Sequence, residues 1–241
     1  KFAKVNVLTK VVLPEGADPA KYSVETSVWN PNKQKLTAVR TSLAQMKYNN
    51  DQAEQEFVIQ DPSLWSPEMP ALYSAETRLY EGDKLKDVYT TPFGIRSIEI
   101  IPDKGFFLNG KRTVFKGVCN HHDLGPLGAA VNDAAIRRQI RILKDMGCNA
   151  IRTSHNMPAP ELIRACDEMG MMIMAESFDE WNVAKCKNGY NLLFDEWAEK
   201  DLVNLLHNFR NNPSVVMWCI GNEVPNQWNE GDTKIAKWLQ D

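Results

Sequence analysis

The stretch Val215-Val216-Met217-Trp218-Cys219-Ile220-Gly221-Asn222-Glu223 decides how this chain is interpreted. Six apolar residues in succession are typical of a parallel strand that is buried on both faces. The run stops at Asn222 and Glu223, so these polar side chains are expected where the carboxyl end of the strand opens into a cleft. The stretch therefore predicts a buried strand that carries a carboxylate to the mouth of an active site.

Three further strand-like segments precede this one, and helical patterns lie between them. Asn132 and Pro160 are suited to the first positions of two helices, and Gly147 and Gly170 to their ends. The alternation of strand and helix demands a parallel sheet. The expected strands are 113–118, 150–153, 171–175 and 215–220, and the later helices are 192–211 and 233–239.

A doubly wound open sheet satisfies the same alternation. However, no glycine-rich phosphate-binding loop follows the first strand, which argues against a nucleotide-binding protein, and polar residues gather at all four strand ends, as in a (β/α)8 barrel. A full barrel needs about 250 residues. Residues 95–241 supply four of its eight units, so we expect the N-terminal half of a TIM barrel, truncated after strand four.

Residues 1–94 follow a different pattern, in which apolar and polar residues alternate in short runs. Turn signals such as Asn30-Pro31-Asn32 and Glu81-Gly82-Asp83 separate these runs. Short strands at near-regular spacing predict an immunoglobulin-like β-sandwich. The expected domains are thus a sandwich over residues 1–94 and a half barrel over residues 95–241.

Composition excludes several classes of function. The net charge of −3 and the pI near 5.9 leave no basic excess for binding nucleic acid. No apolar stretch approaches the roughly 20 residues that cross a bilayer. The five cysteines form neither a CxxC motif nor a zinc-ligand spacing, so we expect thiols rather than a disulfide scaffold.

The side chains at the predicted strand ends are those of a sugar-binding cup. Hydroxyl groups need polar partners, and a pyranose face stacks on an indole ring. Glycoside hydrolysis with retention needs two carboxyl groups about 5–5.5 Å apart. The candidates are His121, Arg152, His155, Asp179, Trp181, Asn222 and Glu223, with Glu223 as the catalytic carboxylate.

Each candidate also has a structural alternative. Glu223 could form an ion pair with Arg152, His155 could cap the next helix, and Trp181 could be a packing residue. Only one of Asp179 and its neighbour Glu180 is expected to face the ligand. Adjacent strand residues point to opposite faces, so one of His121 and His122 is expected in the cup and the other behind it, and no shared metal ion is assigned to them.

Ordered motifs along nearly the whole chain resemble those of glycoside hydrolase family two. Within that family, the segments His121–Gly125 and Glu176–Trp181 look most like β-galactosidases of gut-type bacteria, although β-glucuronidases and β-mannosidases share the scaffold. The motifs are Leu64-Trp65-Ser66-Pro67, Phe93-Gly94-Ile95-Arg96, Lys116-Gly117-Val118, Asn149-Ala150-Ile151-Arg152-Thr153-Ser154-His155, Asn212-Pro213-Ser214 and Gly221-Asn222-Glu223.

The resemblance implies a retaining β-glycosidase that works by double displacement. By similarity, Glu223 is the acid/base, Asn222 contacts the sugar 2-hydroxyl, His121 and His155 surround the donor sugar, and Arg152 lies near the carboxylates. The family's nucleophile, a glutamate at the seventh barrel strand, has no counterpart here. A non-catalytic carbohydrate-binding module is the alternative from another class.

The resemblance also implies that the chain is an internal fragment, inactive alone, that lacks the C-terminal half of the barrel and could self-associate through open sheet edges. No cofactor is assigned. Some relatives hold a divalent ion beside the acid/base, and Glu180 lies near such a position, but the surrounding pattern differs. The compartment stays open between bacterial cytoplasm and periplasm.

Overall fold

The computed structural model describes residues 1–45, 52–228 and 233–241. The chain divides into two compact units, each described here by itself. One comprises residues 1–65 and 71–95, and the other residues 66–70 and 96–241. No helix of the described residues is long and apolar enough to span a bilayer. The five cysteines are free thiols.

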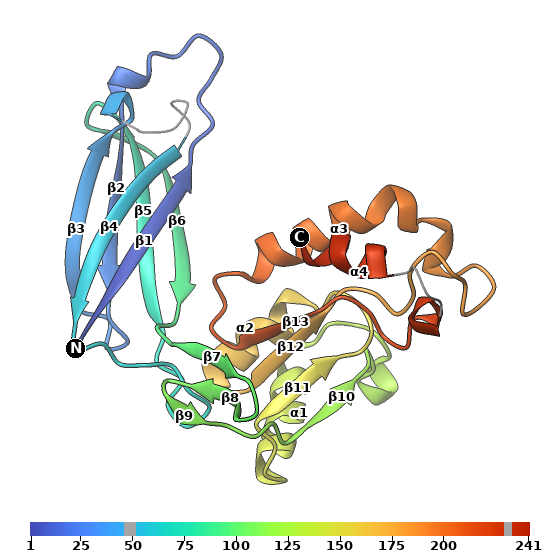
Figure 1. The fold of residues 1–241 in the computed structure, drawn as a ribbon. Coiled ribbons are helices and arrows are strands. Elements are labelled where there is room, and N and C mark those ends of the chain that lie inside the picture. Colours follow the sequence, from blue (N-terminus) through green and yellow to red (C-terminus); the bar gives the residue numbers. More distant parts are fainter. Residues whose placement is uncertain (46–51, 229–232) are drawn as a thin grey trace. The chain divides into compact units, whose positions relative to one another are not determined.

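The first unit is a two-sheet β-structure, which confirms the predicted sandwich (Figure 1). One sheet pairs β1 with β4 and the other has the order β3-β2-β5-β6, all antiparallel. Apolar residues alternate along the strands, so that each sheet has one buried face. The strands are β1 (Phe2–Lys10), β2 (Tyr22–Trp29), β3 (Lys35–Ser42), β4 (Gln52–Gln60), β5 (Tyr73–Glu81) and β6 (Lys84–Phe93).

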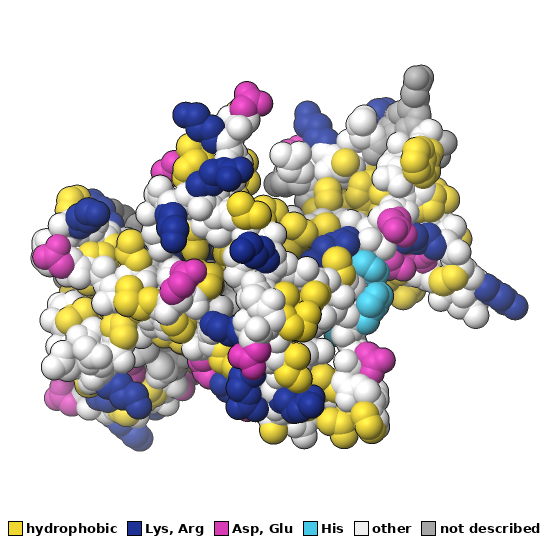
Figure 2. All heavy atoms as spheres, turned by 90° about the horizontal axis from the view of Figure 1, so that it is seen from below, with side chains coloured by type: hydrophobic (Ala, Val, Ile, Leu, Met, Phe, Trp, Pro, Cys, Tyr) yellow, Lys and Arg dark blue, Asp and Glu magenta, His cyan; other side chains and the backbone are white. Residues whose placement is uncertain are grey.

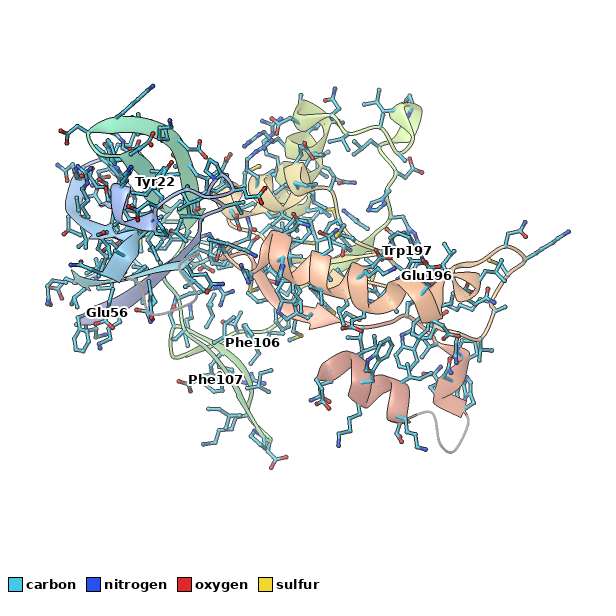
Figure 3. All side chains as sticks on the ribbon, turned by 90° about the horizontal axis from the view of Figure 1, so that it is seen from above. Tyr22, Glu56, Phe106, Phe107, Glu196 and Trp197 are labelled. Atoms are coloured by element: carbon cyan, nitrogen blue, oxygen red, sulfur yellow. The ribbon has the colours of Figure 1, made fainter. Side chains whose placement is uncertain are left out.

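Both sheets of this unit contribute to its core. Val28 on β2, Phe57 on β4 and Tyr73 on β5 pack in one buried cluster, each at most 3% exposed. Figure 3 shows Tyr22 on β2 and Glu56 on β4; Tyr22 is buried, whereas Glu56 lies on the solvent side beside Phe57. Because successive side chains of a strand point to opposite faces of the sheet, every second residue lies in the core.

The second unit begins with a small antiparallel sheet of order β7-β8-β9, formed by β7 (Ile98–Ile101), β8 (Gly105–Leu108) and β9 (Lys111–Arg112). A hairpin turn lies at Asn109-Gly110, where φ is 54° and 77°, as a type I′ turn requires. Phe106 and its neighbour Phe107 project from β8, and Phe106 is the buried one (Figure 3).

A four-stranded parallel sheet of order β10-β11-β12-β13 follows, with helices in its crossovers (Figure 1). This order is the beginning of a (β/α)8 barrel and confirms the predicted fold class. Its elements are β10 (Gly117–Asn120), α1 (Asp133–Asp145), β11 (Ala150–Thr153), α2 (Pro160–Met169), β12 (Met172–Glu176), α3 (Phe194–Phe209), β13 (Val215–Cys219) and α4 (Thr233–Gln240).

The helix boundaries follow the expected signals. The Asn132 side chain accepts a hydrogen bond from the Ala135 amide at 3.0 Å and begins α1. Pro160 opens α2, and Gly170 ends it in the left-handed region, with φ of 71°. Ile140, Ile163, Ile173 and Leu205, from α1, α2, β12 and α3, lie in one core cluster, so the helices cover the sheet with their apolar faces.

The first parallel strand differs from the expected segment 113–118. The ladder begins only at Gly117, opposite Ala150, because β11 is four residues long. Before it, the Asn149 side chain donates to the Val114 carbonyl at 2.9 Å and accepts from the Lys116 amide at 2.8 Å. The Asn149 side chain thus makes the backbone hydrogen bonds that a neighbouring strand would otherwise make.

Two charged side chains, Arg96 and the buried Asp167, fix the start of β13. The guanidinium of Arg96 donates to the Pro213 and Val215 carbonyls, each at 2.6 Å, and burial lowers its pKa. Asp167 on α2 accepts from the Ser214 amide at 2.9 Å, and burial raises the pKa of this carboxyl. The amino end of the strand that leads to Glu223 is therefore held by two side chains from outside the sheet, Arg96 and Asp167.

Candidate active site

The carboxyl ends of the parallel strands bring most of the predicted site residues together. Arg152 lies on β11, Glu176 is the last residue of β12, and Asn222 follows β13. Parallel strands end at the same edge of their sheet, so residues from 24 to 70 positions apart reach hydrogen-bonding distance there. This edge is where a (β/α)8 barrel carries its chemistry.

Arg152 and Glu176 form a partly buried ion pair at these strand ends. Arg152 Nη2 lies 2.6 Å from Glu176 Oε1, and the Glu176 side chain is fully buried. Burial alone would lower the pKa of Arg152, but the hydrogen bonds with Cys119 and Glu176 and the charge of Glu176 outweigh it and raise this pKa. The predicted alternative, an ion pair between Arg152 and Glu223, is thus replaced by a pair with Glu176.

The two predicted histidines are neighbours in the structure. Their rings meet edge to face at 5.0 Å between centroids, and His155 Nδ1 lies 3.1 Å from Glu176 Oε2. The ionised carboxylate only accepts, so Nδ1 carries the proton and Nε2 is left for another partner. His155 does not cap α2, whose N-cap is Ala159. Figure 2 shows histidine side chains gathered in one group on the surface.

The pair His121 and His122 differs from the expectation. One of the two was predicted to pack behind the cup, yet both are exposed. The strand β10 ends at Asn120, so the alternation of strand side chains no longer applies to the residues that follow it.

The side-chain amide of Asn222 is fixed at both ends. Its Oδ1 accepts from Arg152 Nη2 and its Nδ2 donates to Asp179 Oδ1, each at 2.9 Å, and the residue is 8% exposed. Partial burial would raise the pKa of Asp179, but hydrogen bonds from Asn222 and Lys185 and the Lys185 charge bring it below its ordinary value. Asp179 is therefore an anion that orients Asn222.

Glu223 projects into solvent beside this network. It is exposed, whereas its neighbours Asn222 and Val224 are buried. Its φ is 44°, in the left-handed region that residues with a Cβ rarely adopt. Such conformations cluster at functional sites, where the surrounding structure holds them.

Lys185 is a site residue that the sequence analysis missed. Its ammonium donates to Asp179 Oδ1, the Asp179 carbonyl and the Asn222 carbonyl, each at 2.9 Å. It lies in the loop after β12, among charged and polar residues that resemble a solvated surface loop. No pattern in the sequence singles it out, because its partners are fixed only by the fold.

Trp181 lies in the core rather than on a sugar-facing wall. It is 5% exposed, packs beside Phe194 and donates from Nε1 to the Ile220 carbonyl at 2.7 Å. The structure thus favours the packing alternative for this residue. Its indole belongs to the core cluster that also contains Phe194 and Leu205 of α3.

Glu180 does not fit a metal-ligand role. The side chain is 3% exposed, and its two oxygens accept the backbone N–H groups of Lys185 at 2.6 Å and Asn191 at 3.0 Å. Within residues 1–45, 52–228 and 233–241, no group of three potential ligands is arranged to hold a metal ion. We therefore derive no step of the chemistry through a metal.

The fold and the strand-end carboxylates define a class, the glycosidases built on a (β/α)8 barrel. Sequence comparison matches residues 99–240 to "Glycosyl hydrolases family 2, TIM barrel domain" and residues 1–96 to "Glycosyl hydrolases family 2". The chain belongs to glycoside hydrolase family 2.

Relatives with different named activities resemble this chain. A β-galactosidase of Bacteroides ovatus is 50% identical over 176 residues, which are 73% of this chain and 21% of that protein. A β-glucuronidase of Streptococcus agalactiae is 33% identical over 203 residues, 79% of this chain and 34% of that protein. The chain thus spans about a fifth to a third of the length of these curated relatives.

Solved structures agree with this assignment. The crystal structure of a family 2 member from Bacteroides cellulosilyticus superposes with a TM-score of 0.91 and 35% identity, over 99% of this chain and 31% of that one. A β-glycosidase from Bacteroides vulgatus gives a TM-score of 0.83 and 33% identity over 96% of this chain and 30% of that one.

Proposed function

We propose that this chain is part of a longer retaining β-galactosidase that hydrolyses terminal non-reducing β-galactosides, with Glu223 as the general acid and base. The observation that carries the proposal is the position of Glu223. It is an exposed carboxylate that directly follows the buried, doubly hydrogen-bonded Asn222 at the carboxyl end of β13. Similarity to a β-galactosidase of Bacteroides ovatus, at 50% identity, supports the choice of sugar.

The reaction runs in two displacements. In the first, a carboxylate attacks the anomeric carbon while Glu223 gives its proton to the glycosidic oxygen, and the bond between that carbon and that oxygen breaks. In the second, the ionised Glu223 takes a proton from water, whose oxygen attacks the same carbon and releases the carboxylate. Asn222 would hydrogen-bond the sugar 2-hydroxyl, with His121, His155 and Arg152 around the donor sugar.

The nucleophile of this scheme comes from outside these 241 residues. Glu176 is fully buried and its two oxygens bind Arg152 and His155, and the Asp179 carboxylate is held by Asn222 and Lys185. An attacking oxygen must approach to about 3–3.5 Å from the anomeric carbon. We therefore expect the isolated chain to be inactive.

The cations at these strand ends favour a neutral sugar over a uronate. The three donors of Lys185 are taken up by Asp179 and Asn222, and Arg152 is bound by Glu176 and Asn222. Neither would offer an unpaired charge to a sugar carboxylate. A β-glucuronidase or a β-mannosidase remains the second candidate, because a β-glucuronidase of Streptococcus agalactiae is 33% identical to this chain.

The test compares Glu223→Gln with the unaltered full-length protein on nitrophenyl β-galactosides, β-glucuronides and β-mannosides. We expect preferred cleavage of the galactoside, and a loss of roughly 10²- to 10⁴-fold in Glu223→Gln. Glu199→Gln, an exposed glutamate on α3, is the control. Sugar binding without turnover by the unaltered protein would establish a non-catalytic module instead, and turnover by the isolated chain would contradict the missing nucleophile.

A further inference from the structure

The segment that leads to Glu223 is held by residues that follow β12. The Cys219 carbonyl accepts from the Ser177 amide at 3.0 Å and from Ser177 Oγ at 3.2 Å. The Ile220 carbonyl accepts from Trp181 Nε1 at 2.7 Å. The course of residues 219–222 is thus set by a neighbouring loop in addition to the β13 ladder.

Lys185 makes the contact of this kind that lies nearest to Glu223. Its ammonium donates to the Asn222 carbonyl, the Asp179 carbonyl and Asp179 Oδ1, each at 2.9 Å, and its side chain is 22% exposed. An ammonium has three donors, so these contacts account for all of them. Lys185 therefore links the peptide between Asn222 and Glu223 to Asp179, in the loop that follows β12.

The backbone conformation of Glu223 has to be held by hydrogen bonds from its surroundings. Its φ of 44° is a conformation that an L-residue leaves unless its surroundings hold it. The Asn222 carbonyl belongs to the peptide that this φ turns, and Lys185 is its charged partner. Relaxation of that peptide would swing the Cα–Cβ bond of Glu223 and change where its carboxylate points.

We propose that Lys185 is a positioning residue for acid catalysis, which holds the Asn222–Glu223 peptide so that the Glu223 carboxyl meets the glycosidic oxygen. The inference rests on the role of Glu223 proposed above. Lys185 acts through Asn222 and Asp179 and does not touch the substrate, because its donors are already used. Its removal should impair the proton transfer more than substrate binding.

The experiment uses Lys185→Met in the full-length protein, with phenyl and 2,4-dinitrophenyl β-galactosides as substrates. Phenol needs a proton to leave, whereas dinitrophenolate leaves without one. We expect kcat/KM to fall roughly 10- to 100-fold for the phenyl galactoside and by less than about 3-fold for the dinitrophenyl galactoside. Because Glu223 is also the base of the second displacement, kcat and KM for the dinitrophenyl substrate should fall together, which leaves their ratio little changed.

Matched variants separate positioning from folding. Lys187→Met removes an exposed charge from the same loop and should leave both substrates unaffected. Lys185→Arg keeps a cation with several donors and should recover part of the loss. Lys185→Gln has two donors and no charge, so the ratio of the two substrates should shift in the same direction if Lys185→Met fails to fold.

Two outcomes would overturn the inference. Equal losses on both substrates would mean that Lys185 only stabilises the fold, and unchanged kinetics would mean that Glu223 needs no such tie. Glu223→Gln, measured in parallel, distinguishes a failure of the positioning role of Lys185 from a failure of the proposed function of Glu223. If Glu223→Gln keeps full activity on the phenyl galactoside, the acid/base role is wrong. If only Lys185→Met keeps it, the positioning role alone is wrong.

Discussion

Arg152 Nη2 donates to Asn222 Oδ1 at 2.9 Å although strand β12 lies between their two strands. The same nitrogen lies 2.6 Å from Glu176 Oε1 on that middle strand. One guanidinium thus links the ends of three strands and contacts Asn222, the residue that precedes the proposed acid.

Arg152→Met should destabilise the chain by about 3 kcal/mol, because it leaves the fully buried Glu176 carboxylate without its cation. Urea unfolding of the 241-residue chain, followed by tryptophan fluorescence, measures the change. Arg137→Met is the control, since Arg137 forms its ion pairs on the surface and should change stability by less than about 1 kcal/mol. Equal effects of the two variants would mean that burial of Glu176 carries no penalty.

Glu180→Gln should loosen the loop after β12. The Glu180 oxygens accept the Lys185 and Asn191 amides, and an amide group in their place directs its NH2 at one of these donors. Hydrogen exchange should become faster in residues 182–192 while β10 to β12 stay protected. Glu196→Gln is the control, as Glu196 lies exposed on α3 (Figure 3). Unchanged exchange in the loop would show that these two bonds do not order it.

Asp179→Asn should weaken the acid sensitivity of folding. The pKa of Asp179 is lowered in the folded chain, so the unfolded state binds more protons as pH falls through the window below 3.8. The stabilisation from Asp179 is present above that window and is lost as pH falls through the folded-state pKa. Urea midpoints at pH 5 and pH 3 should differ less for Asp179→Asn than for the unaltered chain.

The control for this prediction is Asp145→Asn, which removes an exposed charge from the end of α1. It tests whether a lost negative charge alone changes the acid response. If both variants behave alike, the network around Asn222 and Lys185 is not what lowers the pKa of Asp179.

The isolated 241-residue chain should self-associate. Within the described residues, neither β10 nor β13 has a partner strand on its outer side, and Trp218 on β13 is 39% exposed. Unpaired edges of a parallel sheet are templates for pairing with another chain. Sedimentation velocity should show a larger species as concentration rises, and Trp218→Lys should reduce it. A monomer over the whole concentration range would contradict this prediction.

The sequence alone determined the fold class and supplied the candidate site residues. Apolar runs of four to six residues, with helical periodicity between them, can be satisfied only by parallel strands and crossover helices, and caps such as Asn132 and Gly170 act through local hydrogen bonds and backbone freedom. Strand ends are local features too. Glu223, Asn222, Arg152 and His155 could be chosen as candidates because each follows or ends such a run.

Only the tertiary structure decided which of these residues bind one another. Arg152 has Glu176 as its partner rather than Glu223, and Trp181 is a core residue, because the neighbours of both come from other strands and helices. The role of Lys185 was invisible in the sequence for the same reason. Its acceptors are two carbonyls and a carboxylate that lie 6 and 37 residues away, and only folding brings them within hydrogen-bonding distance.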